Sequence, residues 1–497
     1  MKLLELLYDL NIPLPPSVEA LNITLVTNDT RKVVPGALFV AQAGLHIDGH
    51  ALAPQAVDAG AIAVLVEQAI AGLRVPVVRV PSTKLAYGKV LANFFGRPGD
   101  ALTILGVTGT NGKSTTTFLV DKILRVAGKH TGRFSTIERR IGDTAIYSPL
   151  TTPSAEVLQG FLAECKAAGM THVVVEMSSH GLDQGRCEGI PLSAAALTNV
   201  THDHLDYHRT IRGVYEAKSH IFDLVVPGGS ASPNLDDPYG RAAYDKAKRL
   251  GLRLLGFSHR DTSAPIFGEI LEETLEITRF HLRLPDGEGI VELPMPGVYN
   301  AENALAAAGL AHGVGIDPQH IIAGLNQADP VPGRLQEIKA GQPFKVIVDY
   351  AHSPDSLDKA LHLIRKFHPG KRLVIGFGCP GSRDYEKRPL MGMIAAELAD
   401  FTIVTSEDPR DEDAQKIARE VEYGLAAAGA RFGEDYLVEV DRRAAVRLGL
   451  SICDESCVLV FFGKGHERTQ TIKGVDHPYY DPDVVVEEWH KLAGERG

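Results

Sequence analysis

The chain has 497 residues, 44% of them hydrophobic and 23% charged, a composition typical of a water-soluble globular protein with two to four domains. Its formal net charge of −11 disfavours nucleic acid and acidic membranes as partners, so we expect no nucleic-acid binding and no membrane insertion. The five cysteines are scattered and odd in number, which argues against a disulfide framework.

Residues 1–98 predict a small N-terminal α/β domain. Short apolar strands and helix-like stretches alternate at 37–42, 53–66 and 75–82. Residues 1–16 carry acidic side chains within their apolar stretch and have no small-residue cleavage site, so they predict no signal peptide. No apolar run approaches the length of a transmembrane helix, and we therefore expect a cytoplasmic protein.

Residues 99–332 predict a central domain with a phosphate-binding loop. A linker at 96–99 and a buried strand lead into Gly106-Val-Thr-Gly109-Thr110-Asn111-Gly112-Lys113-Ser114-Thr115, and an apolar helix follows. Glycines let backbone N–H groups close around phosphate oxygens, Lys113 can bridge the β and γ phosphates, and Ser114 or Thr115 can hold Mg²⁺. The alternative, a plain glycine-rich turn, is disfavoured because strand, loop, Lys-Ser and helix occur in order. The loop predicts nucleotide binding, although its spacing from Gly106 is one residue longer than usual.

Polar residues also follow two apolar strands of this domain. Glu176 ends the run at 172–175, where open α/β sheets bind ligands, and it could hold Mg²⁺ or simply face solvent. Three histidines, His202, His204 and His208, follow the strand at 193–197. Their number suggests zinc, but their spacing is not that of a helical pair, and the neighbouring phosphate loop favours magnesium. Lys218, on a helical stretch beyond them, reads by itself as a solvated residue.

The rest of the chain predicts a hairpin-like stretch around 264–293 and then a third α/β domain at 333–497. Apolar runs at 345–350, 372–378, 401–406 and 457–463 predict its strands, and 353–367 predicts a helix. Strands that alternate with helices predict parallel, doubly wound sheets. We therefore expect an α/β protein of three domains: a small N-terminal domain, a central P-loop ATPase domain with a parallel sheet, and a Rossmann-like C-terminal domain.

Several segments together resemble the Mur ligases, in the same order and spacing. They are GTNGKST (109–115), EMSSHGLDQGR (176–186), TNVTHDHLDYH (198–208), EAKSHIF (216–222), GVYNAENALAA (297–307), PGRLQ (332–336), VDYAHSP (348–354) and GKGHE (463–467). The whole chain, N-terminal domain included, is similar to the MurE type. The resemblance implies an ATP-dependent, ADP-forming ligase of bacterial peptidoglycan synthesis. Such an enzyme adds a diamino acid to a UDP-muramoyl dipeptide through an acyl phosphate, and we expect it to act as a monomer.

The same resemblance implies which residues bind ATP and two Mg²⁺ ions. Glu176 and His204 would bind magnesium together with Ser114, and Lys218 would be N-carboxylated so that its carbamate holds the second ion. Lys113, Lys218, His204 and Arg334 would be the catalytic residues. The residues implied to bind ATP are Gly109, Thr110, Asn111, Gly112, Lys113, Ser114, Thr115, Asn300, Asn303, Arg334 and Asp349. From the residues alone, the asparagines near the helix start could equally be caps.

The N-terminal box from Asn28 to Ala41 resembles the family's DSR-x-V-x-PG-x-LFVA segment and implies a domain that binds the UDP-linked substrate. Thr30 replaces the usual serine and keeps the hydroxyl, and Leu150 stands where an asparagine is frequent. The residues implied to bind the UDP-linked substrate are Thr30, His46, Thr151, Thr152, Ser178, Gln184 and Arg186.

The C-terminal domain should select the amino acid. Members of the family that add meso-diaminopimelate carry DNPR where this chain has Glu407-Asp408-Pro409-Arg410, and the arginine holds the distal carboxylate. The residues implied to bind the amino acid are Arg388, Glu407, Asp408, Pro409, Arg410, Gly463 and Glu467. Arg410 favours meso-diaminopimelate, because a buried arginine without a carboxylate is costly. The extra carboxylate at Asp408 keeps L-lysine and L-ornithine open.

Two further alternatives remain. A folylpolyglutamate synthetase or another Mur ligase is disfavoured by the N-terminal box and by EDPR. A P-loop NTPase that acts as a regulatory module would not need Glu176, His204 and Lys218 together.

Overall fold

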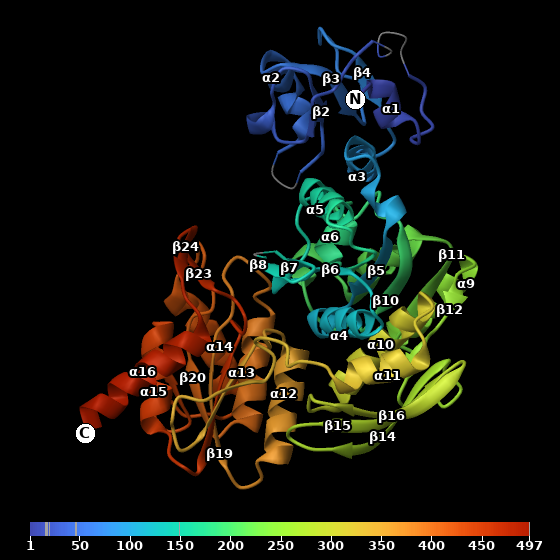
Figure 1. The fold of residues 1–497 in the computed structure, drawn as a ribbon. Coiled ribbons are helices and arrows are strands. Elements are labelled where there is room, and N and C mark those ends of the chain that lie inside the picture. The colour runs from blue at the N-terminus through green and yellow to red at the C-terminus, as the bar shows by residue number, and fades with distance from the viewer. Residues whose placement is uncertain (15–17, 19, 45–46, 149, 497) are drawn as a thin grey trace.

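The computed structural model describes residues 1–14, 18, 20–44, 47–148 and 150–496, which form three α/β parts in sequence order. The N-terminal part lies at the top of the view, the central part below it, and the C-terminal part beside the central one (Figure 1). The predicted α/β class is confirmed. The domain limits after residues 98 and 332 stay a prediction, and both fall between sheets. No helix in the described ranges is long and apolar enough to cross a bilayer.

The N-terminal part is built on a parallel sheet of four strands in the order β1-β2-β3-β4. Its elements are β1 (Leu25–Thr27), β2 (Ala37–Val40), β3 (Ala61–Val66), β4 (Val77–Arg79), α1 (Leu3–Leu7), α2 (Ala53–Asp58) and α3 (Thr83–Phe94). Helix α3 packs on helix α5 (Ala155–Ala167) of the central part. The predicted linker at 96–99 is held in place, because Arg97 forms ion pairs with Asp9 and Asp100.

The central part holds an eight-stranded sheet in the order β12-β11-β10-β5-β9-β6-β7-β8. The strands are β5 (Thr103–Thr108), β6 (Thr131–Phe134), β7 (Glu138–Ile141), β8 (Thr144–Tyr147), β9 (His172–Glu176), β10 (Leu192–Leu197), β11 (Val225–Pro233) and β12 (Arg253–Leu254). Neighbouring strands from β12 to β6 are parallel, and β7 and β8 form an antiparallel edge. The antiparallel edge was not predicted from the sequence.

Helices cover both faces of this sheet. They are α4 (Lys113–Val126), α5, α6 (Ser179–Asp183), α7 (Leu205–His208), α8 (Ile211–Ser219), α9 (Pro238–Arg249), α10 (Val298–Gly313) and α11 (Pro318–Asn326). Ile104 packs in the core that contains α5 and α8, while the next residue, Leu105, packs in the core that contains α4 and α10. Strand β5 is thus buried on both faces, which explains its continuous apolar run.

A second, smaller sheet closes the central part, in the order β13-β14-β15-β16. Its strands are β13 (Phe257–Ser258), β14 (Ile266–Glu273), β15 (Thr278–Leu284) and β16 (Gly287–Leu293). Strands β14, β15 and β16 pair antiparallel, so the hairpin-like stretch predicted around 264–293 is confirmed.

The C-terminal part has a six-stranded sheet in the order β17-β18-β22-β19-β20-β21, parallel except for β17. The strands are β17 (Gln336–Ile338), β18 (Lys345–Asp349), β19 (Arg372–Phe377), β20 (Phe401–Val404), β21 (Tyr436–Val438) and β22 (Cys457–Phe462), with a separate hairpin of β23 (Thr469–Ile472) and β24 (Val475–Pro478). The helices are α12 (Pro354–Phe367), α13 (Lys387–Leu398), α14 (Ala414–Ala427), α15 (Arg442–Ile452) and α16 (Asp481–Arg496). The four strands predicted here, and the helix at 353–367, are confirmed.

Candidate active site

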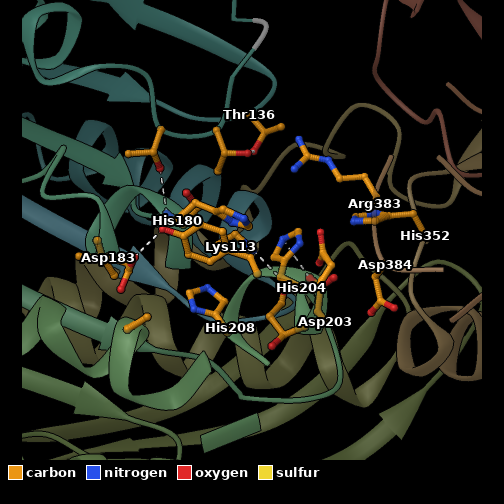
Figure 2. Close-up of a pocket in the computed structure, with 18 of the residues that line it drawn as sticks. Lys113, Thr136, His180, Asp183, Asp203, His204, His208, His352, Arg383 and Asp384 are labelled. Atoms are coloured by element: carbon orange, nitrogen blue, oxygen red, sulfur yellow. Dashed lines mark hydrogen bonds and ion pairs between the residues drawn. The ribbon is translucent and has the colours of Figure 1, made fainter. Parts of the chain in front are cut away.

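A cavity of about 1400 Å³ lies between the central and C-terminal parts, and residues from both line it. Figure 2 shows Lys113, Asp203 and His204 on the central side and His352, Arg383 and Asp384 on the C-terminal side. The carboxyl ends of β5 and β9 open into this cavity, which is where parallel sheets bind ligands.

The phosphate loop follows β5 and packs so closely on Asn303 that one of its glycines has no room for a side chain. Gly112 has φ +87°, and a Cβ atom there would lie 2.1 Å from Asn303 Oδ1. The ammonium of Lys113 donates to the carbonyl oxygens of Gly109 and Thr110, both at 2.9 Å. Burial lowers the pKa of Lys113, although Glu176 and Asp203 oppose the shift. The amine of Lys113 is thus held inside the loop by two of the loop's own carbonyl groups.

Glu176 ends strand β9 and is fully buried. Its carboxylate accepts hydrogen bonds from Ser114 Oγ at 2.9 Å and from the backbone N–H of Thr136 at 2.6 Å. Glu176 is therefore not a solvated strand end. It lies against the loop hydroxyl that the sequence selected as a magnesium ligand.

The ligand atoms of the three predicted histidines do not converge on one point. Within the described ranges, His202, His204 and His208 are in no group of metal-ligating side chains whose ligand atoms converge. His204 Nε2 lies 3.4 Å from Asp203 Oδ2 and its ring packs on that of His180. Burial lowers the pKa of His204 to about 3, although Asp203 opposes the shift, so the imidazole is neutral and free to act as a ligand.

Lys218 is buried, which the sequence alone did not indicate. It lies near the end of α8, and its ammonium donates to the carbonyl oxygen of Gly109 at 2.7 Å. Burial, reinforced by the nearby charge of Lys113, lowers the pKa of Lys218 well below its ordinary value. A buried amine without an ion-pair partner among the described residues is an expensive feature, which points to chemistry rather than stability.

A second cavity of about 430 Å³ adjoins the phosphate loop. Asn300 and Asn303 of α10, Arg334 and Asp349 all contribute to its lining. Gly297 is the N-cap of α10, and neither asparagine caps the helix. Asn111, Gly112 and Thr115 of the loop line this second cavity too, whereas Thr110, Lys113 and Ser114 line the large cavity and Gly109 lines neither.

Three polar contacts tie the C-terminal part to the central one at the loop and the histidine segment. Arg334 Nη2 donates to Ser114 Oγ at 3.3 Å, and Asn111 Nδ2 donates to Asp355 Oδ2 at 2.8 Å. His202 Nε2 lies 3.3 Å from Asp384 Oδ2. Two of these contacts end on phosphate-loop residues.

The C-terminal side of the large cavity is strongly charged. Glu407, Asp408, Arg410 and Glu467 line it, as does Arg383, which the sequence analysis did not select. Neither guanidinium, that of Arg383 or of Arg410, makes a hydrogen bond or ion pair within the described part of the chain. Burial raises the pKa of Glu407 to about 8, with Lys387 opposing and Glu467 reinforcing the shift.

Arg388 is placed differently from the prediction. Its buried guanidinium is 2.6 Å from Glu412 Oε2 and 2.7 Å from Glu420 Oε2, and it does not line the cavity. Arg383, five residues earlier, is the arginine of this segment that faces the cavity (Figure 2). Pro409 and Gly463, also predicted to bind the amino acid, are not among the residues that line the cavity.

Asp408 is neutralised within the protein. Its Oδ1 lies 2.7 Å from Lys464 Nζ and accepts a hydrogen bond from the backbone N–H of Thr471 at 3.0 Å. Lys464 also lies 2.5 Å from Glu467 Oε2, and Tyr350 donates to the other oxygen of Glu467 at 3.2 Å. The extra carboxylate at position 408 therefore has a cation partner, which it shares with Glu467.

The opposite end of the cavity holds most of the predicted contacts to the UDP-linked substrate. The cavity-lining members are Thr151, Thr152, Ser178, Gln184 and Arg186. Arg186 donates to Thr152 O at 2.7 Å and to Gln184 Oε1 at 3.1 Å. Thr30 lies outside the lining, in a short 3-10 helix of the N-terminal part, and His46 lies outside the described residues.

The fold and site together define an ATP-dependent ligase: a phosphate loop, a carboxylate and a buried lysine facing a second α/β part that holds charged side chains. Family models match almost end to end, with the Mur ligase family, catalytic domain at 22–95, the Mur ligase middle domain at 107–311, and the Mur ligase, glutamate ligase domain at 333–465. The chain belongs to the Mur ligase family.

Similar proteins cover nearly the whole chain. A UDP-N-acetylmuramoyl-L-alanyl-D-glutamate--2,6-diaminopimelate ligase of Syntrophomonas wolfei is 37% identical over 98% of this chain and 99% of its own. A UDP-N-acetylmuramyl-tripeptide synthetase of a Roseiflexus species is 38% identical over 89% of each chain. A solved structure of a UDP-N-acetylmuramoyl-L-alanyl-D-glutamate--2,6-diaminopimelate ligase is 29% identical, with a TM-score of 0.69 over 99% of both chains.

Proposed function

We propose that this chain joins meso-diaminopimelate to the D-glutamyl carboxylate of UDP-N-acetylmuramoyl-L-alanyl-D-glutamate and converts ATP to ADP and phosphate. The observation that carries the proposal is the single cavity, which runs from the phosphate loop to Arg383 and Arg410, two arginines without a protein partner among the described residues. An anionic distal group on the amino acid would supply the missing charge. The names of the similar ligases support the same substrates.

The reaction would proceed through an acyl phosphate. The substrate carboxylate attacks the γ-phosphorus of ATP, the bond to the β,γ-bridging oxygen breaks and ADP leaves. Lys113 and Arg334 would hold the charge that develops on the phosphoryl oxygens. The α-amine of the amino acid then attacks the acyl carbon, phosphate leaves, and the amine loses a proton as the amide forms. The protein contributes mainly positioning and charge, because residues predicted to bind the UDP-linked substrate and residues predicted to bind the amino acid line one cavity.

The residues around the loop fit the proposed metal set. Ser114 Oγ lies 2.9 Å from Glu176 Oε1, and both atoms are oxygen ligands of the kind that Mg²⁺ prefers. The imidazole of His204 is neutral because burial lowers its pKa. Bound Mg²⁺ would neutralise phosphate charge at this point. Lys218 fits the predicted carbamate, because burial lowers its pKa and favours the neutral amine, whose nitrogen can bond to the carbon of CO₂ and release a proton.

The carbamate has its own test. Turnover by the wild-type enzyme should fall when bicarbonate is depleted and recover when it is restored, and Lys218→Ala should be inactive at any bicarbonate concentration. Full activity of Lys218→Ala without added carbonate would contradict the proposal.

L-Lysine and L-ornithine are the second candidate amino acids, and the acidic pair at Glu407 and Asp408 is the observation that favours them. A free carboxylate in the pocket would bind the side-chain ammonium of L-lysine or L-ornithine, which have no distal carboxylate. Asp408, however, is held by Lys464 at 2.7 Å and by the backbone N–H of Thr471, so its carboxylate is not free to bind a substrate ammonium. The Asp408→Asn variant should therefore keep the wild-type order of preference among the three amino acids.

The deciding experiment measures phosphate release from ATP with the UDP-muramoyl dipeptide and each of meso-diaminopimelate, L-lysine and L-ornithine. Turnover with meso-diaminopimelate, and a tripeptide product of the matching mass, would support the proposal. Turnover with only L-lysine or L-ornithine would keep the ligase but reject the assigned amino acid. ATP hydrolysis without dependence on any amine would favour a regulatory NTPase instead.

A further inference from the structure

Arg442 is a fully buried arginine and the first residue of α15. Its guanidinium makes four hydrogen bonds. It donates to Ser406 O at 3.1 Å and to Phe462 O at 2.8 Å, and it forms a bidentate pair with Asp481 at 2.9 and 2.6 Å. Arg442 is not among the residues that line the cavity.

The two carbonyl groups precede the two segments that carry the acidic pocket residues. Ser406 comes directly before Glu407, just beyond the end of β20, and Phe462 is the last residue of β22 and comes directly before Gly463. Strand β19 lies between β20 and β22 in the sheet. The two strand ends therefore share no ladder hydrogen bonds. Arg442 joins their backbones, while the Asp408–Lys464 pair joins side chains of the segments that follow.

Asp481 keeps the bridge charged and oriented. It is the first residue of α16, is fully buried, and accepts a further hydrogen bond from Tyr479 Oη at 2.8 Å. Although burial opposes it, the Asp481 carboxylate raises the pKa of Arg442 above its ordinary value. A planar guanidinium can serve two carbonyls and a carboxylate at fixed angles, which a lysine ammonium cannot do.

We propose that Arg442, held by Asp481, is a positioning residue that fixes the separation of the segments 407–410 and 463–467, and through it the affinity for the incoming amino acid. The inference rests on the proposed function, because these segments line the end of the cavity assigned to the amino acid. The nucleotide end is built from other elements, so its affinity should be independent of Arg442.

The test compares Arg442→Lys and Arg442→Met with a matched control. Arg443→Met removes the ion pairs of the next residue with Glu487 and Glu488, which join the same two helices but do not reach the strand ends. In Arg442→Lys, we expect the KM for meso-diaminopimelate to rise about tenfold or more and the KM for ATP to stay within about twofold. Arg443→Met should leave both KM values within about twofold.

Hydrogen exchange gives a second measurement that needs no activity. The backbone N–H groups of Arg410 and Gly463 are hydrogen-bonded to Thr471 O and Asp349 O, and both should exchange faster in Arg442→Lys than in Arg443→Met. If Arg442→Met does not fold, because Asp481 is left as an unpaired buried charge, Arg442→Lys decides the matter.

A folded Arg442→Lys enzyme with an unchanged KM for the amino acid and unchanged exchange at both amides would overturn the proposal. Equal increases in the KM for ATP and for the amino acid would also overturn it, because they would indicate a general loss of structure. If the wild-type enzyme shows no amine-dependent turnover, the proposed function fails, while the exchange rates still decide whether Arg442 fixes the two segments.

Discussion

Replacing Arg410 with alanine should separate two classes of amino-acid substrate. The backbone of Arg410, at φ +53°, is held from both sides: its N–H donates to Thr471 O at 2.9 Å, and its carbonyl accepts from the N–H of Lys473 at 2.6 Å. The substitution therefore removes the guanidinium with little reason for the loop to move. A hydrogen-bonded pair of this charge type contributes about 1.5–3 kcal/mol, or roughly a 10- to 150-fold loss in kcat/KM for meso-diaminopimelate.

L-Lysine supplies the control for this prediction, because it has the same carbon chain without the distal carboxylate. Phosphate release should be measured with both amines for wild type and Arg410→Ala, which gives the coupling between the guanidinium and the distal carboxylate. The kcat/KM for L-lysine should change by less than about twofold, since no carboxylate is lost as a partner. Equal losses with both amines, or no loss with meso-diaminopimelate, would refute the assignment of Arg410.

Three other substitutions follow from the structure. Gly112→Ala should abolish detectable ATP binding, because its Cβ would lie 2.1 Å from Asn303 Oδ1; retained binding by calorimetry would reject the loop as the phosphate site. Arg383→Ala should raise the KM for the amino acid about tenfold, and an unchanged KM would remove Arg383 from the pocket. The pKa of His259 is raised from 6.5 to about 9, mainly by its hydrogen bond and ion pair with Asp236 and then by those with Glu302. This stabilisation is complete below about pH 6.5 and is lost as the pH rises through about 9, so His259→Gln should lower Tm at pH 6 much more than at pH 10.

Local sequence patterns predicted those elements that are buried on both faces. The apolar runs that became β5, β18 and β22 were predicted as strands because each is short, continuous and rich in Val, Ile, Leu or Phe. The edge strands β7 and β8 were missed: β8 is exposed along its whole length, so its residues carry no apolar alternation. Strand β24 is likewise exposed along its whole length. Strand β23 forms a β-bridge with Arg410 through Ile472, a contact between distant residues that local sequence patterns do not show.

Site residues could be predicted where they are contiguous in one recognisable motif. They were harder to predict where their role depends on the direction of a side chain in the folded protein. Lys113 and Ser114 could be selected because loop, lysine and hydroxyl are contiguous. Nothing in the sequence distinguishes Arg383 from Arg388, which lie five residues apart in one polar segment. Arg388 lies in the first turn of α13 and forms ion pairs with Glu412 and Glu420. These residues are far apart in the sequence, and only folding brings them together. Lys218 likewise reads as a solvated residue until α8 is packed against the loop.

The phosphate loop is hydrogen-bonded to the C-terminal part of the protein through Asn111 with Asp355 and Ser114 with Arg334. The same loop would therefore bind both the nucleotide and the C-terminal part. Any ligand that changes how the loop holds Asp355 and Arg334 also changes the free energy of docking that part. Thermodynamic linkage then requires reciprocity: the factor by which ATP alters the affinity for the amino acid equals the factor by which the amino acid alters the affinity for ATP. The junction, rather than any direct contact between the two ligands, would carry that coupling free energy.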